Sequence, residues 1–208
     1  MVRPLPYKTI KRAIDIAGSA ALLGISAPAF VVISAMIKRE SDGPVFFVHE
    51  RVGLNGKPIK IYKFRSMRTG SEDLEAELND EDLEKYYREF KLKNDPRITE
   101  TGHKLRRISA DELPQLFNVI RGDMSLVGPR PVTAEELKFY SDDERARLLS
   151  VKPGLTGYWQ VNDRSDATYQ SGRRQKMELY YADNRSLLMD LGILLKTPLA
   201  VIRKRGAY

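Results

Sequence analysis

The feature that most restricts the fold of this chain is an uncharged, largely apolar segment at residues 16–37. Its 22 residues are enough for a helix that spans the hydrocarbon core of a bilayer, which takes about 20 residues. The apolar region of a signal peptide is shorter, at about 7–15 residues. We therefore expect this segment to be a membrane helix and the chain to be membrane-associated.

Two features of the segment bear on whether its helix crosses the bilayer. Pro28 lies near the middle, two positions after Ser26, and a proline removes one backbone hydrogen bond and kinks a helix. Basic residues lie on both sides of the segment, and such flanks prefer the cytoplasmic side. A re-entrant helix that turns at Ser26 and Pro28 satisfies both flanks, with the freed backbone groups met by Ser26 or by packed protein. A single spanning helix is the alternative.

Composition limits the partners and the chemistry. The length of 208 residues suits one domain with an appendage. Lys and Arg total 35 against 28 Asp and Glu, so the net charge of +7 favours phosphorylated substrates, anionic lipid or nucleic acid. The absence of cysteine excludes disulfides and thiolate chemistry. His49 and His103 lie far apart without the paired spacing of a metal site.

Residues 106–131 set two adjacent carboxylates, Asp111 and Glu112, among basic residues. Because Pro114 is tolerated only at the start of a helix, we expect a helix to begin near residues 109–112, with the acid pair at its N-terminus. One interpretation is structural, with Ser109 and Glu112 forming a capping box. The other is a phosphate site in which a carboxylate is the nucleophile. The cations available to such a site are Arg106, Arg107, Arg121 and Arg130.

The remaining pattern is mixed helix and strand. A hairpin is predicted from strands at residues 45–48 and 59–64, with its turn at residues 51–56. Lys63 and Arg65 then share a strand face, where they either grip a phosphate or protect an exposed edge. Helices are expected at residues 83–92, 134–140, 143–149 and 173–183, after an acid-rich stretch at 71–82 that reads as a solvated helical face. The apolar residues 187–202, followed by basic residues 203–205, suit an amphipathic helix on a membrane or a core helix.

The acid pair suggests a chemistry if the substrate is a nucleotide sugar. Its pyrophosphate repels a carboxylate, so attack requires cations, and Mg²⁺ with Arg and Lys is the usual solution. An aspartate that attacks phosphorus divides one transfer into two steps. Glu112 would hold the metal, and the membrane helix would place the site at the level of a lipid phosphate.

Several long motifs resemble the bacterial sugar transferase family, the monotopic phosphoglycosyl transferases, over nearly the whole chain. They are KRAIDI, PVFFVHERVGLNGK, IYKFRSM, SADELPQLFNVIRGDMSLVGPRP, KPGLTGYWQVN and LLMDLGIL. The resemblance implies a transferase that moves a sugar-1-phosphate from a UDP-sugar to undecaprenyl phosphate and releases UMP. It would act on the cytoplasmic face of the bacterial inner membrane and begin exopolysaccharide, capsule or O-antigen assembly. Membrane lipid is an expected partner, a homodimer is plausible, and nucleic acid is not expected.

The resemblance also implies roles for particular residues. Asp111 would form a covalent phosphosugar intermediate in a ping-pong reaction, and Glu112 would help to hold Mg²⁺. The positions expected to bind substrate are Lys63, Arg65, Arg107, Arg130, Arg164 and Glu178. Pro28 matches the proline that marks a re-entrant helix in this family, which favours that alternative over a spanning helix.

The resulting expectation is an α+β fold that is mostly helical, with a small β-hairpin and interfacial amphipathic helices. Residues 1–40 would form the re-entrant membrane helix and residues 41–208 a cytoplasmic catalytic domain lying on the membrane surface. Since larger relatives carry additional N-terminal spanning helices, the chain is expected to be the minimal form or a truncation.

Three positions depart from the family pattern. Ala27 intervenes between Ser26 and Pro28, Asp163 replaces a usual glycine near Arg164, and Glu178 replaces an aspartate. The insertion at residues 71–95 resembles galactose or glucose phosphotransferases and favours a hexose donor, with an N-acetylated amino sugar as the alternative. A non-catalytic basic membrane-anchored binding protein and an Mg²⁺-dependent phosphohydrolase are the rival functions.

Overall fold

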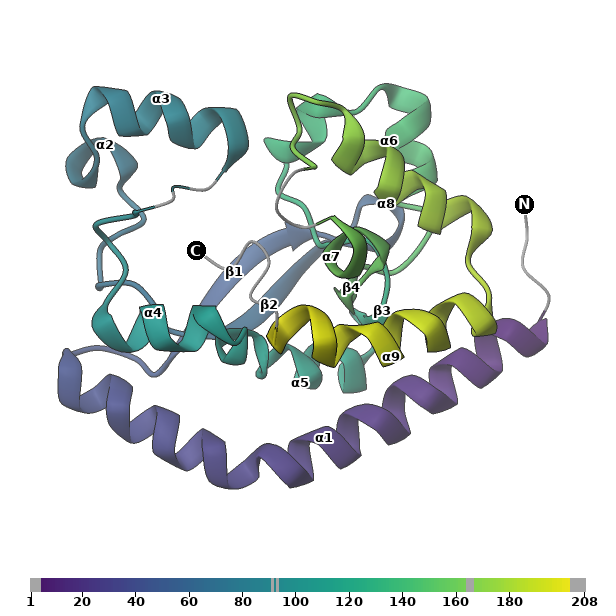
Figure 1. Ribbon diagram of the computed structural model, residues 1–208, viewed down its shortest axis with the longest axis horizontal. Coiled ribbons are helices and arrows are strands. Elements are labelled where there is room, and N and C mark those ends of the chain that lie inside the picture. Colours follow the sequence, from purple (N-terminus) through teal and green to yellow (C-terminus); the bar gives the residue numbers. More distant parts are fainter. Residues whose placement is uncertain (1–4, 91, 93, 164–166, 203–208) are drawn as a thin grey trace.

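The computed structural model describes residues 5–90, 92, 94–163 and 167–202 of the chain, and its fold is a helix-rich mixture of α and β elements (Figure 1). The α-helices are α1 (Leu5–Glu40), α2 (Leu74–Glu77), α3 (Asp80–Glu89), α4 (Glu100–Arg107), α5 (Gln115–Arg121), α6 (Asp142–Leu148), α7 (Tyr158–Asn162), α8 (Arg173–Asn184) and α9 (Leu187–Ile202). The strands are β1 (Phe46–Val52), β2 (Pro58–Phe64), β3 (Ser125–Val127) and β4 (Gly154–Thr156). Three short 3₁₀ turns are η1 (Leu54–Gly56), η2 (Ala110–Glu112) and η3 (Glu136–Phe139). The mostly helical fold with a small hairpin confirms that part of the prediction.

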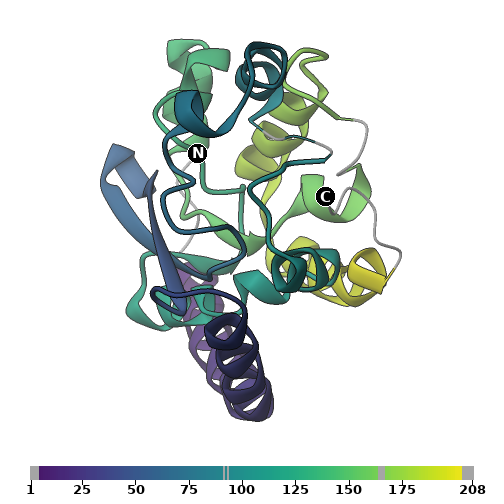
Figure 2. The ribbon, with the colours of Figure 1, turned by 90° about the vertical axis from the view of Figure 1, so that its left-hand side faces the viewer.

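Helix α1 lies below the rest of the domain and contains Pro28. Figure 1 shows it bent near its middle, with both ends rising toward the other elements, and Figure 2 shows it projecting from one side of the domain. Among the described residues, α1 alone is long and apolar enough to cross a bilayer, and only 11% of its most apolar window is buried. Most of the apolar surface of this window is therefore not covered by other parts of the described chain.

The predicted hydrogen bonding at the proline needs a correction. Pro28 has no N–H and leaves the Gly24 carbonyl without its usual helical donor. The Ser26 hydroxyl donates instead to the Leu22 carbonyl at 2.7 Å. Because an i−4 hydroxyl bond of this kind bends a helix, Ser26 adds to the bend but does not take the place of the missing N–H.

The first arm of α1 is fixed to the domain by polar side chains. Arg12 donates to the Val119 and Ile120 carbonyls at the end of α5, at 2.6 and 2.7 Å. Asp15 is buried and accepts hydrogen bonds from the Ser125 hydroxyl at 3.0 Å and the Leu126 N–H at 2.9 Å. The charged residue that directly precedes the apolar segment therefore contacts β3.

The predicted hairpin is confirmed, with its turn later than expected. Strands β1 and β2 pair antiparallel from Phe46 opposite Phe64 to Val52 opposite Pro58. Residues 51 and 52, expected in the turn, extend β1 because Val52 also pairs with Val132. The reversal falls on residues 53–57, where Asn55 adopts φ 56°.

A second, parallel pair of strands brings residues 125–131 beside residues 152–156. Ser125 pairs with Gly154 and Val127 with Thr156. The backbones approach so closely that a Cβ on Gly154 would lie 2.0 Å from the Gly128 nitrogen. Only glycine fits there, and the contact fixes the course of the chain leading to Arg130. The main core lies beside this pair and contains Leu116, Val127 and Tyr181 among its buried members.

The acid-rich stretch forms α2 and α3, and helix α9 carries an exposed apolar face. In place of the helix expected at residues 134–140, the structure has the shorter 3₁₀ turn η3 (Glu136–Phe139). Helices α6 and α8 agree with the prediction.

On α9, Leu188, Leu195 and Ile202 are exposed whereas Asp190 and Ile193 are buried. This pattern is that of an amphipathic helix; the basic residues 203–205 lie outside the described residues.

Candidate active site

The acid pair lies in the 3₁₀ turn η2, between α4 and α5. Ser109 turns the chain with a left-handed φ of 54° and makes no side-chain capping bond. Helix α5 begins only at Gln115, so the predicted helix start near residues 109–112 is too early and the predicted capping box is wrong. The reason is that Ser109 is in a conformation from which its hydroxyl does not reach the following N–H groups. The structure thus gives no support to the purely structural interpretation of the pair as a capping box.

Two cations from distant parts of the chain converge on Glu112. Lys63 Nζ, from β2, donates to Glu112 Oε1 at 2.9 Å, and Arg130 Nη1 lies 3.4 Å from the same oxygen. Lys63 is largely buried; burial lowers its pKa, and the nearby Glu112 and Asp111 carboxylates oppose that effect. Asp111 is itself buried next to Glu112. Three segments therefore meet as one cluster of alternating charge.

Arg106 is half-buried, whereas the adjacent Arg107 is exposed, and the charge of the acid pair acts on the pKa of Arg106. Burial lowers the pKa of Arg106, and the strongest opposing influence is the carboxylate of Asp111. The Arg106 Nε donates to the Ser66 hydroxyl at 2.9 Å, which holds the side chain in place. Arg107 is exposed on the last turn of α4. The sequence predicts both arginines near the site, but adjacent residues of α4 point in different directions, so the two side chains have different surroundings.

Two other predicted residues have different surroundings. Arg65 donates to the carbonyls of Asp42 at 2.7 Å and Ser41 at 2.9 Å, just beyond the end of α1. It therefore holds the connection between α1 and β1. Although Lys63 and Arg65 share a strand face, the two cations bind different partners. Arg164 lies outside the described residues.

Glu178 of α8 is buried behind the Arg130 backbone. Its carboxyl oxygens accept from the Arg130 N–H at 3.2 and 3.3 Å. Burial raises the pKa of Glu178 to about 7, against the opposing influence of Arg174. Glu178, which is 1% exposed, thus holds the Arg130 backbone from which the guanidinium extends.

A small pocket opens beside the cluster. Its polar lining consists of Arg51, Lys63, Glu112, Gln115, Arg130 and Gln160. Arg51 was not predicted as a site residue, although it stands in the ERVG motif; its Nη1 lies 2.6 Å from Glu136 Oε2. The lining carries three cations and one carboxylate, an excess of positive charge that suits a phosphate-bearing ligand.

The carboxylate content of the site bears on metal binding. Within the part of the chain that the structure describes, no group of three or more His, Asp or Glu side chains is placed to hold a metal. Mg²⁺ keeps several waters and takes one or two protein carboxylates together with substrate phosphates. Asp111 and Glu112 fit that smaller donor set, with Lys63 occupying one Glu112 oxygen.

An apolar helix joined to a domain with an acid pair among cations is consistent with the sugar transferase class. The profile described as "Bacterial sugar transferase" matches residues 6–204, and the chain belongs to this family.

Named relatives agree with this membership. The chain is 45% identical over 202 residues to the undecaprenyl-phosphate galactose phosphotransferase of Salmonella typhimurium, covering 96% of this chain and 42% of that protein. It is 43% identical over 210 residues to the exopolysaccharide production protein ExoY of Rhizobium meliloti, covering 100% and 91%. The undecaprenyl-phosphate glucose phosphotransferase of Komagataeibacter xylinus is 37% identical over 206 residues, covering 95% and 37%. The chain therefore spans about two fifths of the length of some relatives and most of the length of others.

Proposed function

We propose that this chain transfers a hexose-1-phosphate, with galactose or glucose as the sugar, from a UDP-sugar to undecaprenyl phosphate and releases UMP. The observation that carries the proposal is the buried Asp111 next to Glu112, which is held between Lys63 and Arg130. The names of the Salmonella and Komagataeibacter relatives support the acceptor and the hexose. An N-acetylated amino sugar is the alternative donor.

In the first step, an oxygen of Asp111 attacks the phosphorus that bears the sugar. A new P–O bond forms to the carboxylate, the bond to the bridging oxygen breaks, and UMP leaves with that electron pair. Arg106 and Arg130 are placed to balance charge on the phosphoryl oxygens. Mg²⁺, held by Glu112, would neutralise the pyrophosphate charge.

In the second step, a phosphate oxygen of the polyprenyl phosphate attacks the same phosphorus. The bond to Asp111 breaks and the carboxylate is regenerated, so the product is a polyprenyl diphosphate sugar. The carboxylate is a good leaving group because Arg106 stabilises its charge as it departs. Donor and acceptor bind in turn, which gives ping-pong kinetics.

Helix α1 supports the proposed placement in the membrane. Its two ends rise toward the same side of the molecule, and Ile25 near its middle is 79% exposed (Figure 1). A re-entrant helix at residues 1–40 would bury that middle in one leaflet, with residues 41–208 on the cytoplasmic face of the bacterial inner membrane. The reaction would then be the first membrane step of exopolysaccharide, capsule or O-antigen assembly.

A panel of UDP-sugars, each with and without undecaprenyl phosphate, tests the proposal. We expect UMP release and lipid-linked product with UDP-galactose or UDP-glucose, and a phosphosugar adduct on Asp111 by mass spectrometry. Asp111→Asn should abolish both. If the Asn variant retained turnover, the nucleophile would lie elsewhere, and sugar phosphate released without lipid would indicate a phosphohydrolase.

A further inference from the structure

Helix α5 carries apolar side chains on a buried face and on an adjoining exposed face. Leu116 and Val119 are fully buried in the core, whereas Phe117 and Ile120 are 50% and 37% exposed. A surface helix of a soluble domain would carry polar side chains at those positions. We therefore expect the exposed face of α5 to contact an apolar partner.

A third exposed apolar side chain precedes the acid pair in the sequence. Ile108, which is 55% exposed, precedes Asp111 by one turn of chain, and Phe117 follows Glu112 at the start of α5. We call the three side chains Ile108, Phe117 and Ile120 the apolar rim. The acid pair is thus flanked on both sides in sequence by exposed apolar residues.

The apolar rim is continuous with helix α1. The Phe117 ring lies 6.1 Å from that of Phe30 in an edge-on arrangement. Between the rim residues, Ala110 and Leu113 pack with Ile33 and Ile37 of α1. The segment that carries the acid pair therefore packs on the part of α1 that follows Pro28, next to its apolar surface.

Charge next to the rim selects the kind of apolar partner. Arg106 and Lys63 lie at the acid pair, where a phosphate would bind, and the rim begins within two residues of Arg106. A ligand that satisfies both has an anionic phosphate head joined directly to a hydrocarbon chain. Bulk lipid tails would satisfy the rim but would leave the cations without that phosphate.

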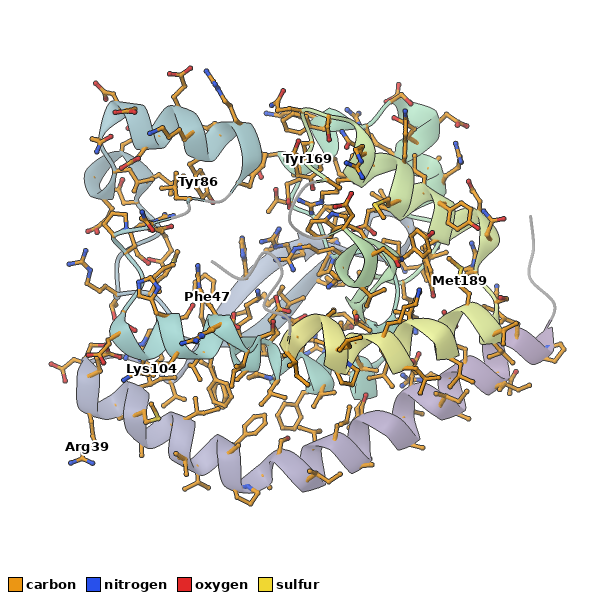
Figure 3. All side chains as sticks on the ribbon, viewed as in Figure 1. Arg39, Phe47, Tyr86, Lys104, Tyr169 and Met189 are labelled. Atoms are coloured by element: carbon orange, nitrogen blue, oxygen red, sulfur yellow. The ribbon has the colours of Figure 1, made fainter. Side chains whose placement is uncertain are left out.

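We propose that Ile108, Phe117 and Ile120 bind the first isoprene units of the acceptor's hydrocarbon chain. The inference rests on the proposed function, since an acceptor phosphate that reaches Asp111 leaves its first units against the side chains that flank it. The exposed Leu188 has no such position. It lies in the first turn of α9, and Figure 1 shows this end of α9 away from α4, while Figure 3 labels its neighbour Met189 on the other side of the view from Lys104 of α4.

The test compares the two half-reactions in detergent micelles of fixed concentration: UMP release in the single turnover that loads Asp111, which needs no acceptor, and transfer from Asp111 to undecaprenyl phosphate. The readout is Vmax/KM for undecaprenyl phosphate divided by the amount of UMP released in the single turnover, so that any general loss of active enzyme cancels. We expect Phe117→Ala and Ile108→Ser each to lower this ratio about tenfold, because they remove apolar contact that only the acceptor makes. Phe117→Leu, which keeps an apolar side chain, should stay within about threefold of wild type.

The matched control is Leu188→Ala, which removes an apolar side chain that is 81% exposed on α9. Its ratio should remain within about twofold of wild type, because it lies away from the acid pair. An unchanged ratio in both Phe117→Ala and Ile108→Ser would overturn the inference, as would an equal fall in Leu188→Ala, which indicates general bilayer contact. If wild type gave no lipid-linked product with undecaprenyl phosphate, the proposed function itself would fail, and the inference with it.

Discussion

Arg130 donates its backbone N–H to the buried carboxyl of Glu178 at 3.2 Å, while its guanidinium lies 3.4 Å from Glu112. One residue thus joins the acid pair to helix α8. The backbone bond fixes the chain direction at Arg130, and the close contact of Gly128 with Gly154 fixes it from the other side. Glu178 is accordingly a positioning residue whose own protonation matters to the fold.

The first prediction concerns the pH dependence of stability. The pKa of Glu178 is raised from 4.5 to about 7 by burial, so the folded protein holds its proton while the unfolded chain loses it. Stability should fall as pH rises from about 4.5 to about 7, by about 3 kcal/mol from this group. In Glu178→Gln that part of the slope should be absent, as measured by urea unfolding at pH 5, 6, 7 and 8. The exposed Glu135→Gln is the control and should keep the wild-type slope.

Much of the fold was predictable because local signals were strong. Alternation and glycines marked the hairpin, and apolar length with Pro28 marked α1. The details that failed depend on tertiary contacts. Val52 stays in β1 because it pairs with Val132, and the left-handed Ser109 moves the start of α5 to Gln115. No local sequence pattern predicts the Val52–Val132 pairing or the left-handed conformation of Ser109.

The candidate site shows the same division. Asp111, Glu112, Lys63 and Arg130 were selected from motifs, and the structure brings Lys63 and Arg130 onto Glu112. Arg106 and Arg107 are adjacent, so only the phase of α4 decides which one faces the acids. Arg51 reaches the pocket through the hairpin and is held by Glu136, a contact across 85 residues that the sequence does not reveal.

The second prediction uses the adjacent arginines as a matched pair. Arg106→Gln should lower kcat/KM for UMP release about 10- to 100-fold, the effect of losing one hydrogen bond or ion pair to a charged group. Arg107→Gln removes the same charge from the next residue, where it is exposed, and should stay within about threefold. Equal losses in the two variants would contradict the assignment of Arg106 to the acid pair.

The third prediction concerns the metal. Removal of divalent ions with EDTA should abolish UMP release, and added Mg²⁺ should restore it. Glu112→Gln should raise the Mg²⁺ concentration for half-maximal activity about tenfold or more, because a neutral amide is a poorer ligand than a carboxylate. Lys63→Met should lower that concentration by freeing the Glu112 oxygen that Lys63 occupies, even if kcat falls. A Glu112→Gln enzyme with the wild-type Mg²⁺ requirement would place the metal on other ligands.

The last prediction asks whether α1 is only an apolar anchor. If it were, replacing its buried charge by leucine would strengthen membrane attachment and leave the domain unharmed. Asp15, however, accepts from the Ser125 hydroxyl and the Leu126 N–H, and both donors are buried at β3.

Asp15→Leu should therefore destabilise the protein by about 2–4 kcal/mol, since it leaves two buried donors without an acceptor. Asp15→Asn retains an oxygen acceptor and should lose less than half as much. Ala21→Leu adds apolar area at an exposed position of the same helix and should leave the unfolding midpoint unchanged. Thermal unfolding of the three variants in one detergent separates the cases: an Asp15→Leu protein as stable as Ala21→Leu would mean that α1 anchors the domain without forming part of its fold.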